Sequence, residues 1–287
     1  MGRMKPDFLI IGAAKSGTNW LATNLRRNPG CFISDGEIHY FSRFHDTEPP
    51  EWYAAFFAGR RTGQIAGERS NTYMTDPQAA ARIHAALPDA RLLAILRNPI
   101  ERAYSGYCMR LDRGFVSEDI ASHLDPANPL SRGLLLNGLY SRQLAGFRER
   151  FPRRQLHVAI HDDITLRPAG LLGEISAFLG VPHDFDAAPL KERTNVRKSY
   201  GVKRGYKRLL GPLMRNERLR KGISRTLNAS AIGRSLLRLG SGELKHPPLT
   251  GEVRARLASY YADEVALLSD YTGRDLGGWL AAEKSLP

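Results

Sequence analysis

Residues 8–21, which read FLIIGAAKSGTNWL, decide the fold of this chain. Phe8 to Ile11 is a short, continuously apolar run, which is typical of a strand buried on both faces of a parallel sheet. A glycine-rich turn follows, and the apolar spacing then predicts a helix from Trp20 to Arg27. A strand, a glycine-rich turn and a helix N-terminus together favour anion binding, because backbone N–H groups and the helix dipole face the ligand.

The glycine-rich turn differs from a Walker A loop, in which lysine directly follows the second glycine. Gly12 and Gly17 have the Walker A separation, but Lys15 lies inside the loop. Asn19 stands where a Walker A loop has the Ser or Thr that binds Mg²⁺. The pattern therefore disfavours a metal-dependent nucleotide kinase or NTPase, which is kept as an alternative.

Strands and helices alternate along the rest of the chain. The predicted strands are 65–68, 91–96 and 156–160, and the predicted helices are 76–87, one beginning at Pro99, 134–151, 171–179 and 250–268. This alternation predicts an α/β fold, a P-loop-like parallel sheet flanked by helices on both faces. Ligands of such sheets bind beyond the carboxyl ends of the strands.

A second motif follows the strand at 91–96 and reads RNPIERAYS, from Arg97 to Ser105. An arginine at the carboxyl end of a strand can bind a phosphate through two hydrogen bonds. Pro99 can begin a helix without loss of a hydrogen bond, because an amide N–H at that position has no acceptor within the helix. Ser105 lies about two turns into that helix. A nucleotide with a separate 3′-phosphate needs a second anion site of this kind, whereas ATP does not.

The two motifs resemble those of sulfotransferases that use 3′-phosphoadenosine 5′-phosphosulfate (PAPS), in particular the heparan-sulfate branch and bacterial carbohydrate or natural-product enzymes. The resemblance implies that the first loop holds the 5′-phosphosulfate, with Lys15 beside the bridging oxygen and Trp20 stacked on adenine. It implies that the second motif binds the 3′-phosphate. The implied cofactor-binding residues are Lys15, Ser16, Gly17, Thr18, Asn19, Trp20, Arg97 and Ser105.

Residues 35–41 read DGEIHYF and resemble the Glu-x-His-Phe-Phe stretch of the same enzymes. The resemblance implies that Glu37 is the general base, which sulfuryl transfer needs because the acceptor hydroxyl must lose its proton. His39 is the alternative base or a contact to the leaving oxygen, and Lys15 completes the implied catalytic set. If the segment is extended, Glu37, His39 and Phe41 share one face.

Residues 67–73 read GERSNTY and resemble the family's Glu-Lys-(Ser/Thr)-Pro stretch. Arg69 stands in place of the usual lysine, and Asn71 in place of the usual proline. We predict that Arg69 lies on the substrate side and contacts the sulfate or Glu37. Arginine does not replace lysine in every respect, because it cannot deliver a proton.

The net charge of +13 is concentrated in one segment. Residues 191–238 contain fifteen basic and two acidic residues, so the remainder of the chain is neutral. The family closes a late basic loop over the 3′-phosphate, for which Arg197 and Lys198 are favoured over Arg220-Lys221-Gly222. Residues 203–238 can be a solvated basic face, a clamp for an anionic acceptor or the cofactor, or a patch that contacts an anionic membrane.

We predict one sulfotransferase domain over residues 1–287, with 191–240 as a basic helical insertion or lid. Two cysteines exclude a disulfide framework, and the absence of a signal segment or of ~20 consecutive apolar residues predicts a cytoplasmic protein, peripheral at the membrane under the third interpretation. The predicted reaction moves a sulfuryl group from PAPS to a carbohydrate, lipid-linked or natural-product hydroxyl, without a metal and with no nucleic-acid partner. The second alternative is a basic binding module with an inactive nucleotide fold.

Overall fold

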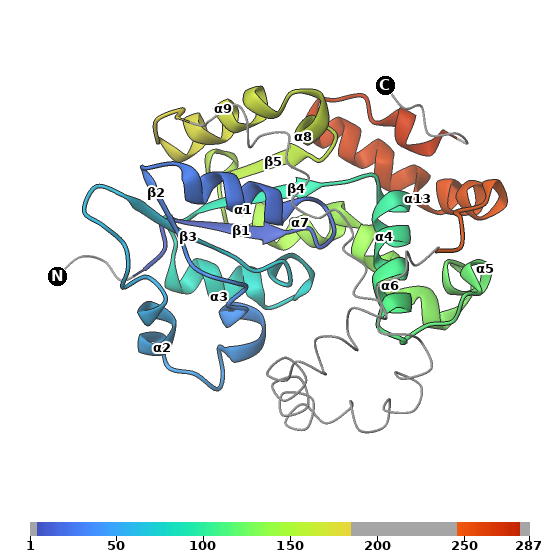
Figure 1. Ribbon diagram of the computed structural model, residues 1–287, viewed down its shortest axis with the longest axis horizontal. Coiled ribbons are helices and arrows are strands. Elements are labelled where there is room, and N and C mark those ends of the chain that lie inside the picture. Colours follow the sequence, from blue (N-terminus) through green and yellow to red (C-terminus); the bar gives the residue numbers. More distant parts are fainter. Residues whose placement is uncertain (1–4, 185–245, 282–287) are drawn as a thin grey trace, which may run out of the picture.

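A parallel sheet organises the computed structural model, which describes residues 5–184 and 246–281 (Figure 1). Its strands within those residues, in the order β2-β3-β1-β4-β5, are β1 Phe8–Gly12, β2 Cys31–Ile33, β3 Ile65–Arg69, β4 Arg91–Leu96 and β5 Leu156–Ile160. Leu9 of β1 pairs with Glu68 of β3 on one side and with Leu92 of β4 on the other. The carboxyl ends of these three strands therefore meet at one edge of the sheet.

Helices and short helical turns connect the strands. The longer helices are α1 Thr18–Arg27, α3 Ala79–Ala86, α4 Pro99–Asp112, α7 Tyr140–Arg148, α9 Pro168–Leu179 and α13 Gly251–Thr272. The shorter ones are α2 Pro50–Ala55, α5 Ile120–His123, α6 Arg132–Leu135 and α8 Asp163–Leu166. The turns are η1 Tyr40–Phe44, η2 Tyr73–Thr75, η3 Pro129–Ser131, η4 Leu136–Gly138, η5 Arg153–Gln155 and η7 Gly277–Leu280.

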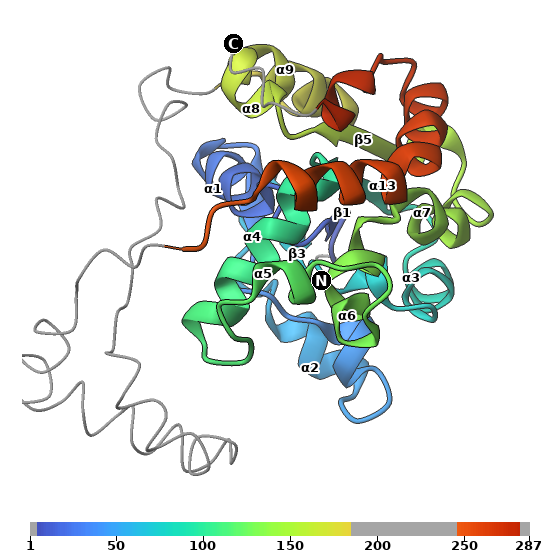
Figure 2. The same ribbon diagram turned by 90° about the vertical axis from the view of Figure 1, so that its right-hand side faces the viewer.

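Apolar side chains cover both faces of the sheet, which is why the central strands β1 and β4 are almost entirely apolar. On one face, α1 and α9 contribute Leu21, Leu25 and Ile175 to a buried cluster. On the other face, α3, α4, α7 and α13 form the larger cluster, and α13 packs against α4 and α7 (Figure 2). The α/β prediction with helices on both faces is confirmed.

All the predicted strands are present, and β4 and β5 have the predicted bounds. The edge strand β2 was not predicted, because its three residues are too few to show a pattern. The regular helix α3 begins at Ala79, after a short turn. The Asp76 carboxylate accepts hydrogen bonds from the Gln78 and Ala79 amides, as the side chain at a helix N-cap does.

The predicted helix over 134–151 is wrong. The chain forms α6, η4 and α7 there, and Leu139 leaves the helical region with φ −86° and ψ 72°. The Tyr261 hydroxyl of α13 occupies this break and donates to the Leu135 carbonyl at 2.7 Å. A Cβ at position 138 would lie 2.8 Å from that hydroxyl, so Gly138 permits the close approach. The basic segment 191–240, with Arg197 and Lys198, lies outside the described residues.

Gly67 supplies a stability prediction for the sheet. A Cβ on Gly67 in β3 would overlap the ring of Phe8, the residue it pairs with in β1. Gly67→Ala should therefore lower the free energy of unfolding by about 1–3 kcal/mol through overpacking, measured by urea denaturation. Gly251→Ala is the control, because nothing lies within 4 Å of its added methyl group. Equal midpoints for the two variants would contradict the prediction.

Candidate active site

Two loops meet where β1 and β4 end. The Arg97 guanidinium donates to the Lys15 carbonyl at 3.3 Å across 82 residues of sequence. Two residues earlier on each side, the Ala13 amide donates to the Ile95 carbonyl at 3.0 Å. The hydroxyl of Tyr140 also donates to the Arg97 carbonyl, at 2.9 Å. The two anion-binding motifs of the sequence therefore form one continuous rim.

The backbone of the first loop is shaped for an anion. Lys15 and Gly17 have φ values of 71° and 96°, in the left-handed region, and such turns direct successive N–H groups inward. A Cβ on Gly17 would overlap Ile164 of α8, so the turn requires glycine. No side chain caps the N-terminus of α1 and no acidic residue lies in its first turn, which favours a negatively charged ligand there.

The predicted cofactor side chains differ in their exposure. Lys15 in the loop and Asn19 in the first turn of α1 are half-buried, and the Lys15 ammonium lies 3.9 Å from the sulfur of Met109 on α4. Ser105 is half-buried on the same helix. Trp20 is 4% exposed and packs in the cluster beneath α1, so adenine stacking by its ring stays a prediction.

The hydroxyl residues of the first loop are buried. Ser16 is fully buried beside the Tyr140 hydroxyl. Thr18, the first residue of α1, is 4% exposed. Backbone amides of the loop favour an anion, and cofactor binding by the Ser16 and Thr18 side chains stays a prediction.

The Glu37 carboxylate is held by three side chains on the acceptor side. Its Oε1 accepts hydrogen bonds from Arg69 at 2.6 Å and from the Asn71 amide at 2.8 Å. Its Oε2 lies 3.1 Å from Nε2 of His39. Burial lowers the pKa of Arg69, and the negative charge of Glu37 opposes that shift. The structure thus brings together Glu37, His39 and Arg69, and Asn71 joins them at the same carboxylate.

The segment around His39 is not extended, so the predicted common face of Glu37, His39 and Phe41 is wrong. His39 has φ 59°, in the left-handed region, and begins the turn η1. This reversal sends Phe41 into the core, where it is 1% exposed. Glu37 and His39 still face each other. The His39 ring is fixed on its other side by Thr72, whose Oγ1 lies 2.8 Å from Nδ1.

A polar network that was not predicted from the sequence lies beneath this segment. Glu68 of β3 is fully buried and accepts hydrogen bonds from the hydroxyls of Tyr53, Tyr73 and Ser70. A carboxylate inside an otherwise buried strand is the signal that could have found it, because such a group needs partners that the local sequence does not reveal.

The C-terminal turn η7 joins the ends of β4 and β5. The Trp279 indole N–H donates to Asp162 at 2.9 Å, and the Asn98 amide donates to the Trp279 carbonyl at 2.8 Å. Asn98 also caps α4 by accepting from the Ile100 amide at 2.9 Å. Arg274, two residues after α13, hydrogen-bonds to the carboxylate of Asp163 in α8. We call the contacts of Trp279 and Arg274 with Asp162, Asn98 and Asp163 the C-terminal brace. Through Asn98, this brace supports the residue that follows Arg97.

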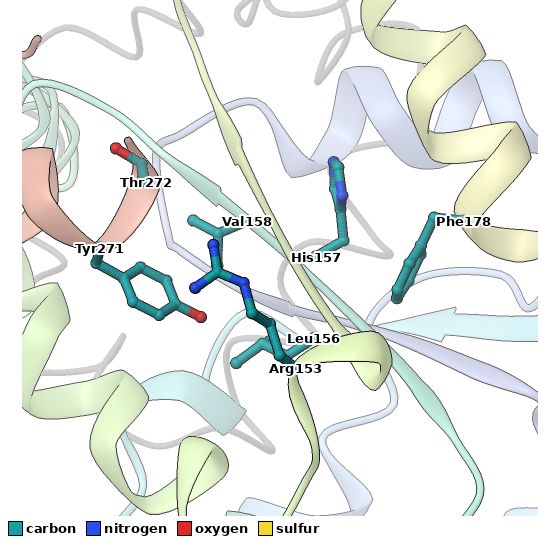
Figure 3. A pocket seen from close by; sticks show the side chains of 7 residues that line it. All are labelled: Arg153, Leu156, His157, Val158, Phe178, Tyr271 and Thr272. Carbon is teal, nitrogen blue, oxygen red and sulfur yellow. The ribbon is translucent and has the colours of Figure 1, made fainter. Parts of the chain in front are cut away.

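A cavity of about 220 Å³ lies beside β5, away from these loops (Figure 3). Arg153 and Tyr271 lie on one side of the strand there, and His157 and Phe178 on the other. Burial lowers the pKa of His157. The cavity contains none of the predicted site residues.

Within 5–184 and 246–281, no group of three or more His, Cys, Asp or Glu side chains could hold a metal, and no helix is long and apolar enough to cross a membrane.

Comparison with known proteins decides the family. A family model described as "Sulfotransferase domain" matches residues 5–269. The chain belongs to the sulfotransferase family. The resemblance predicted from the two motifs is thereby confirmed. A crystal structure of a sulfotransferase from Alicyclobacillus acidocaldarius has the same fold, with a TM-score of 0.69 at 23% identity over 96% of this chain and 99% of that one.

Several curated sulfotransferases are related in sequence. Human heparan sulfate glucosamine 3-O-sulfotransferase 6 is 30% identical over 184 residues, 62% of this chain and 53% of that protein. Mouse bifunctional heparan sulfate N-deacetylase/N-sulfotransferase 3 is 26% identical over 310 residues, 97% of this chain and 31% of that protein. This sulfotransferase therefore spans about half the length of the first and less of the second.

Asp163 supplies a pH-dependent test of the C-terminal brace. Burial alone would raise the pKa of Asp163, but hydrogen bonds from Arg167 and Arg274 outweigh burial and lower it. A lowered pKa stabilises the fold above the unfolded value of ~3.9, and this stabilisation is lost as the pH falls through the folded value. Asp163→Asn should thus cost about 1–2 kcal/mol at neutral pH, since both arginines are partly exposed, and progressively less in acid.

The measurement is the free energy of unfolding of wild type and variant at neutral pH and near pH ~3. Asp263→Asn, on the exposed face of α13, is the matched control and should change little at either pH. If the loss of unfolding free energy in Asp163→Asn does not diminish in acid, the negative charge of Asp163 is not what holds the segment after α13.

Proposed function

We propose that this sulfotransferase uses PAPS as the donor and transfers its sulfuryl group to a hydroxyl of a carbohydrate. The observation that carries the proposal is the contact between Arg97 and the Lys15 carbonyl, which joins two anion-binding motifs at one rim. A nucleotide with a single phosphate chain, such as ATP, needs only the first motif. A donor with phosphates at both the 5′ and 3′ positions accounts for both.

The residues present fit such a donor. The turn through Lys15 and Gly17 and the uncapped start of α1 would hold the 5′-phosphosulfate. Arg97 and Ser105 would hold the 3′-phosphate, Arg97 by a bidentate contact. Arg197 and Lys198 complete the proposal as residues of a basic lid over 191–240, within one domain spanning residues 1–287.

The proposed reaction is an in-line displacement at sulfur. The acceptor oxygen forms a bond to sulfur, and the bond from sulfur to the bridging oxygen breaks, giving a sulfate ester and adenosine 3′,5′-bisphosphate. The proton of the acceptor hydroxyl passes to Glu37. Lys15 neutralises the charge that develops on the leaving phosphate, so positioning and electrostatic stabilisation supply most of the catalysis.

The contacts of Glu37 support its assignment as the base. Arg69 and Asn71 both occupy Oε1, which leaves Oε2, on the His39 side, as the oxygen that receives the proton. His39 is fixed between Glu37 and Thr72, an arrangement suited to orienting the carboxylate and the acceptor. Arg69 stays charged throughout, since its guanidinium does not deprotonate in this reaction.

A carbohydrate acceptor follows from the names of the relatives, which are heparan sulfate sulfotransferases. Because the chain spans only part of those proteins, the acceptor is proposed as a class rather than as heparan sulfate itself. Transfer of labelled sulfate from PAPS to a panel of glycosaminoglycan and other glycan oligosaccharides tests this class, with lipid-linked and natural-product hydroxyls as the alternative outcomes.

Arg97 gives the test of the donor. Wild-type protein without Mg²⁺ should bind adenosine 3′,5′-bisphosphate more tightly than adenosine 5′-monophosphate, because only the former reaches the second motif. Arg97→Met should weaken binding of the bisphosphate by tenfold or more, about 1.5–3 kcal/mol, and leave the monophosphate nearly unchanged. Isothermal titration calorimetry measures the affinity of wild type and variant for both nucleotides.

Arg91→Met is the matched control, because Arg91 lies at the opposite end of the same strand. It should not alter the preference between the nucleotides. Tighter binding of ATP with Mg²⁺ than of the bisphosphate by wild type would contradict the proposed donor.

Glu37 gives the test of the base. Glu37→Gln preserves the size of the side chain but removes the proton acceptor, so kcat for sulfuryl transfer should fall by about 10²- to 10⁴-fold while binding of the bisphosphate is unchanged. Asp35→Asn is the control, since Asp35 is an exposed carboxylate two residues away. Near-normal turnover in Glu37→Gln would exclude Glu37 as the base.

A further inference from the structure

Glu68 lies at the centre of a buried network that the proposed chemistry does not use. It belongs to β3, pairs with Leu9 of β1, and is completely shielded from solvent. Its Oε1 accepts from the hydroxyls of Tyr53 at 2.9 Å and Tyr73 at 2.5 Å, and its Oε2 accepts from Ser70 at 2.6 Å. The distances from Tyr73 and Ser70 lie in the range of about 2.5–2.7 Å that is typical of hydroxyls donating to an ionised oxygen.

The ionised state fixes the direction of each hydroxyl hydrogen. A carboxylate has no hydrogen to give, so every hydroxyl around it must donate and can only accept from other neighbours. Burial raises the pKa of Glu68, and the hydrogen bonds from Ser70, Tyr73 and Tyr53 oppose that shift. Burial and the nearby charge of Glu68 also hold the pKa values of Tyr53 and Tyr73 well above the usual range, which keeps both phenols protonated as donors.

Two of these hydroxyls meet backbone amides of the acceptor-side segment. The Ser70 hydroxyl accepts from the His39 amide at 2.8 Å, and the Tyr73 hydroxyl accepts from the Phe41 amide at 3.4 Å. Amides at the start of a helical turn have no partner within the turn itself. No side chain of η1 or its flanking residues caps them, so the caps come from the residues that follow β3.

The conformation that these amides hold is the one that presents Glu37. His39 adopts a left-handed conformation, which is uncommon and strained for a residue other than glycine. Its ring then faces Oε2 of Glu37 at 3.1 Å. The strain at this position persists only if the surroundings determine it, and the hydroxyl of Ser70 is the group that contacts its amide.

We propose that Glu68 is a positioning residue for sulfuryl transfer: as a buried carboxylate it orients the Ser70 and Tyr73 hydroxyls, whose oxygens then hold the His39 and Phe41 amides and so the Glu37–His39 pair. The catalytic part of this inference rests on the proposed function. Glu68 touches neither the donor nor the acceptor. Its effect is transmitted by hydroxyl groups whose donor and acceptor directions are fixed, from β3 inside the sheet to residues 37–41.

The chain contains a matched pair of variants that separates this relay from general support of the core. Tyr73→Phe and Tyr53→Phe each remove one phenolic hydroxyl that donates to the same oxygen of Glu68. Only Tyr73 passes the contact on to an amide of residues 37–41. Ser70→Ala breaks the other branch, and Glu68→Gln disturbs both, because its amide nitrogen donates where the carboxylate accepted.

The experiment is hydrogen–deuterium exchange of the full chain, read at peptides covering residues 37–41 and 8–21. Glu68→Gln and Ser70→Ala should speed exchange in 37–41 by about tenfold, the equivalent of one lost hydrogen bond, with 8–21 unchanged. Tyr73→Phe should speed it less, in line with its longer contact, and Tyr53→Phe should leave it within twofold. In the transfer assay, Glu68→Gln and Ser70→Ala should lower kcat by about tenfold to a hundredfold without changing KM for PAPS.

Two results would overturn the relay: unchanged exchange in 37–41 for Ser70→Ala, or an equal rise for Tyr53→Phe and Tyr73→Phe. If Glu68→Gln does not fold, the Ser70 and tyrosine variants decide the question, since each retains the carboxylate. If wild type transfers no sulfuryl group to any acceptor, the proposed function fails, and the exchange rates still establish whether Glu68 holds the segment.

Discussion

The central place of β1 in a parallel sheet is the constraint on which the rest of the structure depends. Hydrogen bonds to β3 on one side and β4 on the other force three chain reversals onto one edge. The turn at Lys15, the polar residues after Glu68 and the guanidinium of Arg97 all follow from that pairing. In an antiparallel arrangement these groups would lie at opposite ends of the sheet.

Many polar groups at this edge are paired between elements that are distant in sequence. The two loops proposed to bind the donor share the contact between Arg97 and the Lys15 carbonyl. The acceptor-side segment is held by side chains that converge on two carboxylates, Glu37 near the surface and Glu68 beneath it. Because desolvated carboxylates need donors, each of them gathers residues from separate elements into a defined geometry.

The C-terminal residues complete this edge from outside the sheet. Trp279 contacts Asp162, which follows β5, and Asn98, which follows β4. The turn η7 therefore links the two segments that leave these paired strands. Tyr261 of α13 similarly enters the break between α6 and α7. These contacts join parts of the chain more than a hundred residues apart, which is why local sequence patterns predicted an unbroken helix over 134–151.

Local sequence patterns predicted the parallel sheet, the helices on both faces and the two motifs proposed to bind the donor, because each depends on apolar runs and turns within about twenty residues of chain. The sequence also predicted Glu37, His39 and Arg69 as residues of the catalytic and substrate side, and their part in the chemistry stays a proposal. Only the tertiary structure decided how they meet: the left-handed turn at His39, the convergence of Arg69 and Asn71 on one oxygen, and the buried Glu68 beneath them. These features depend on hydrogen bonds between residues that are distant in sequence, and no local pattern encodes which donor will reach which acceptor.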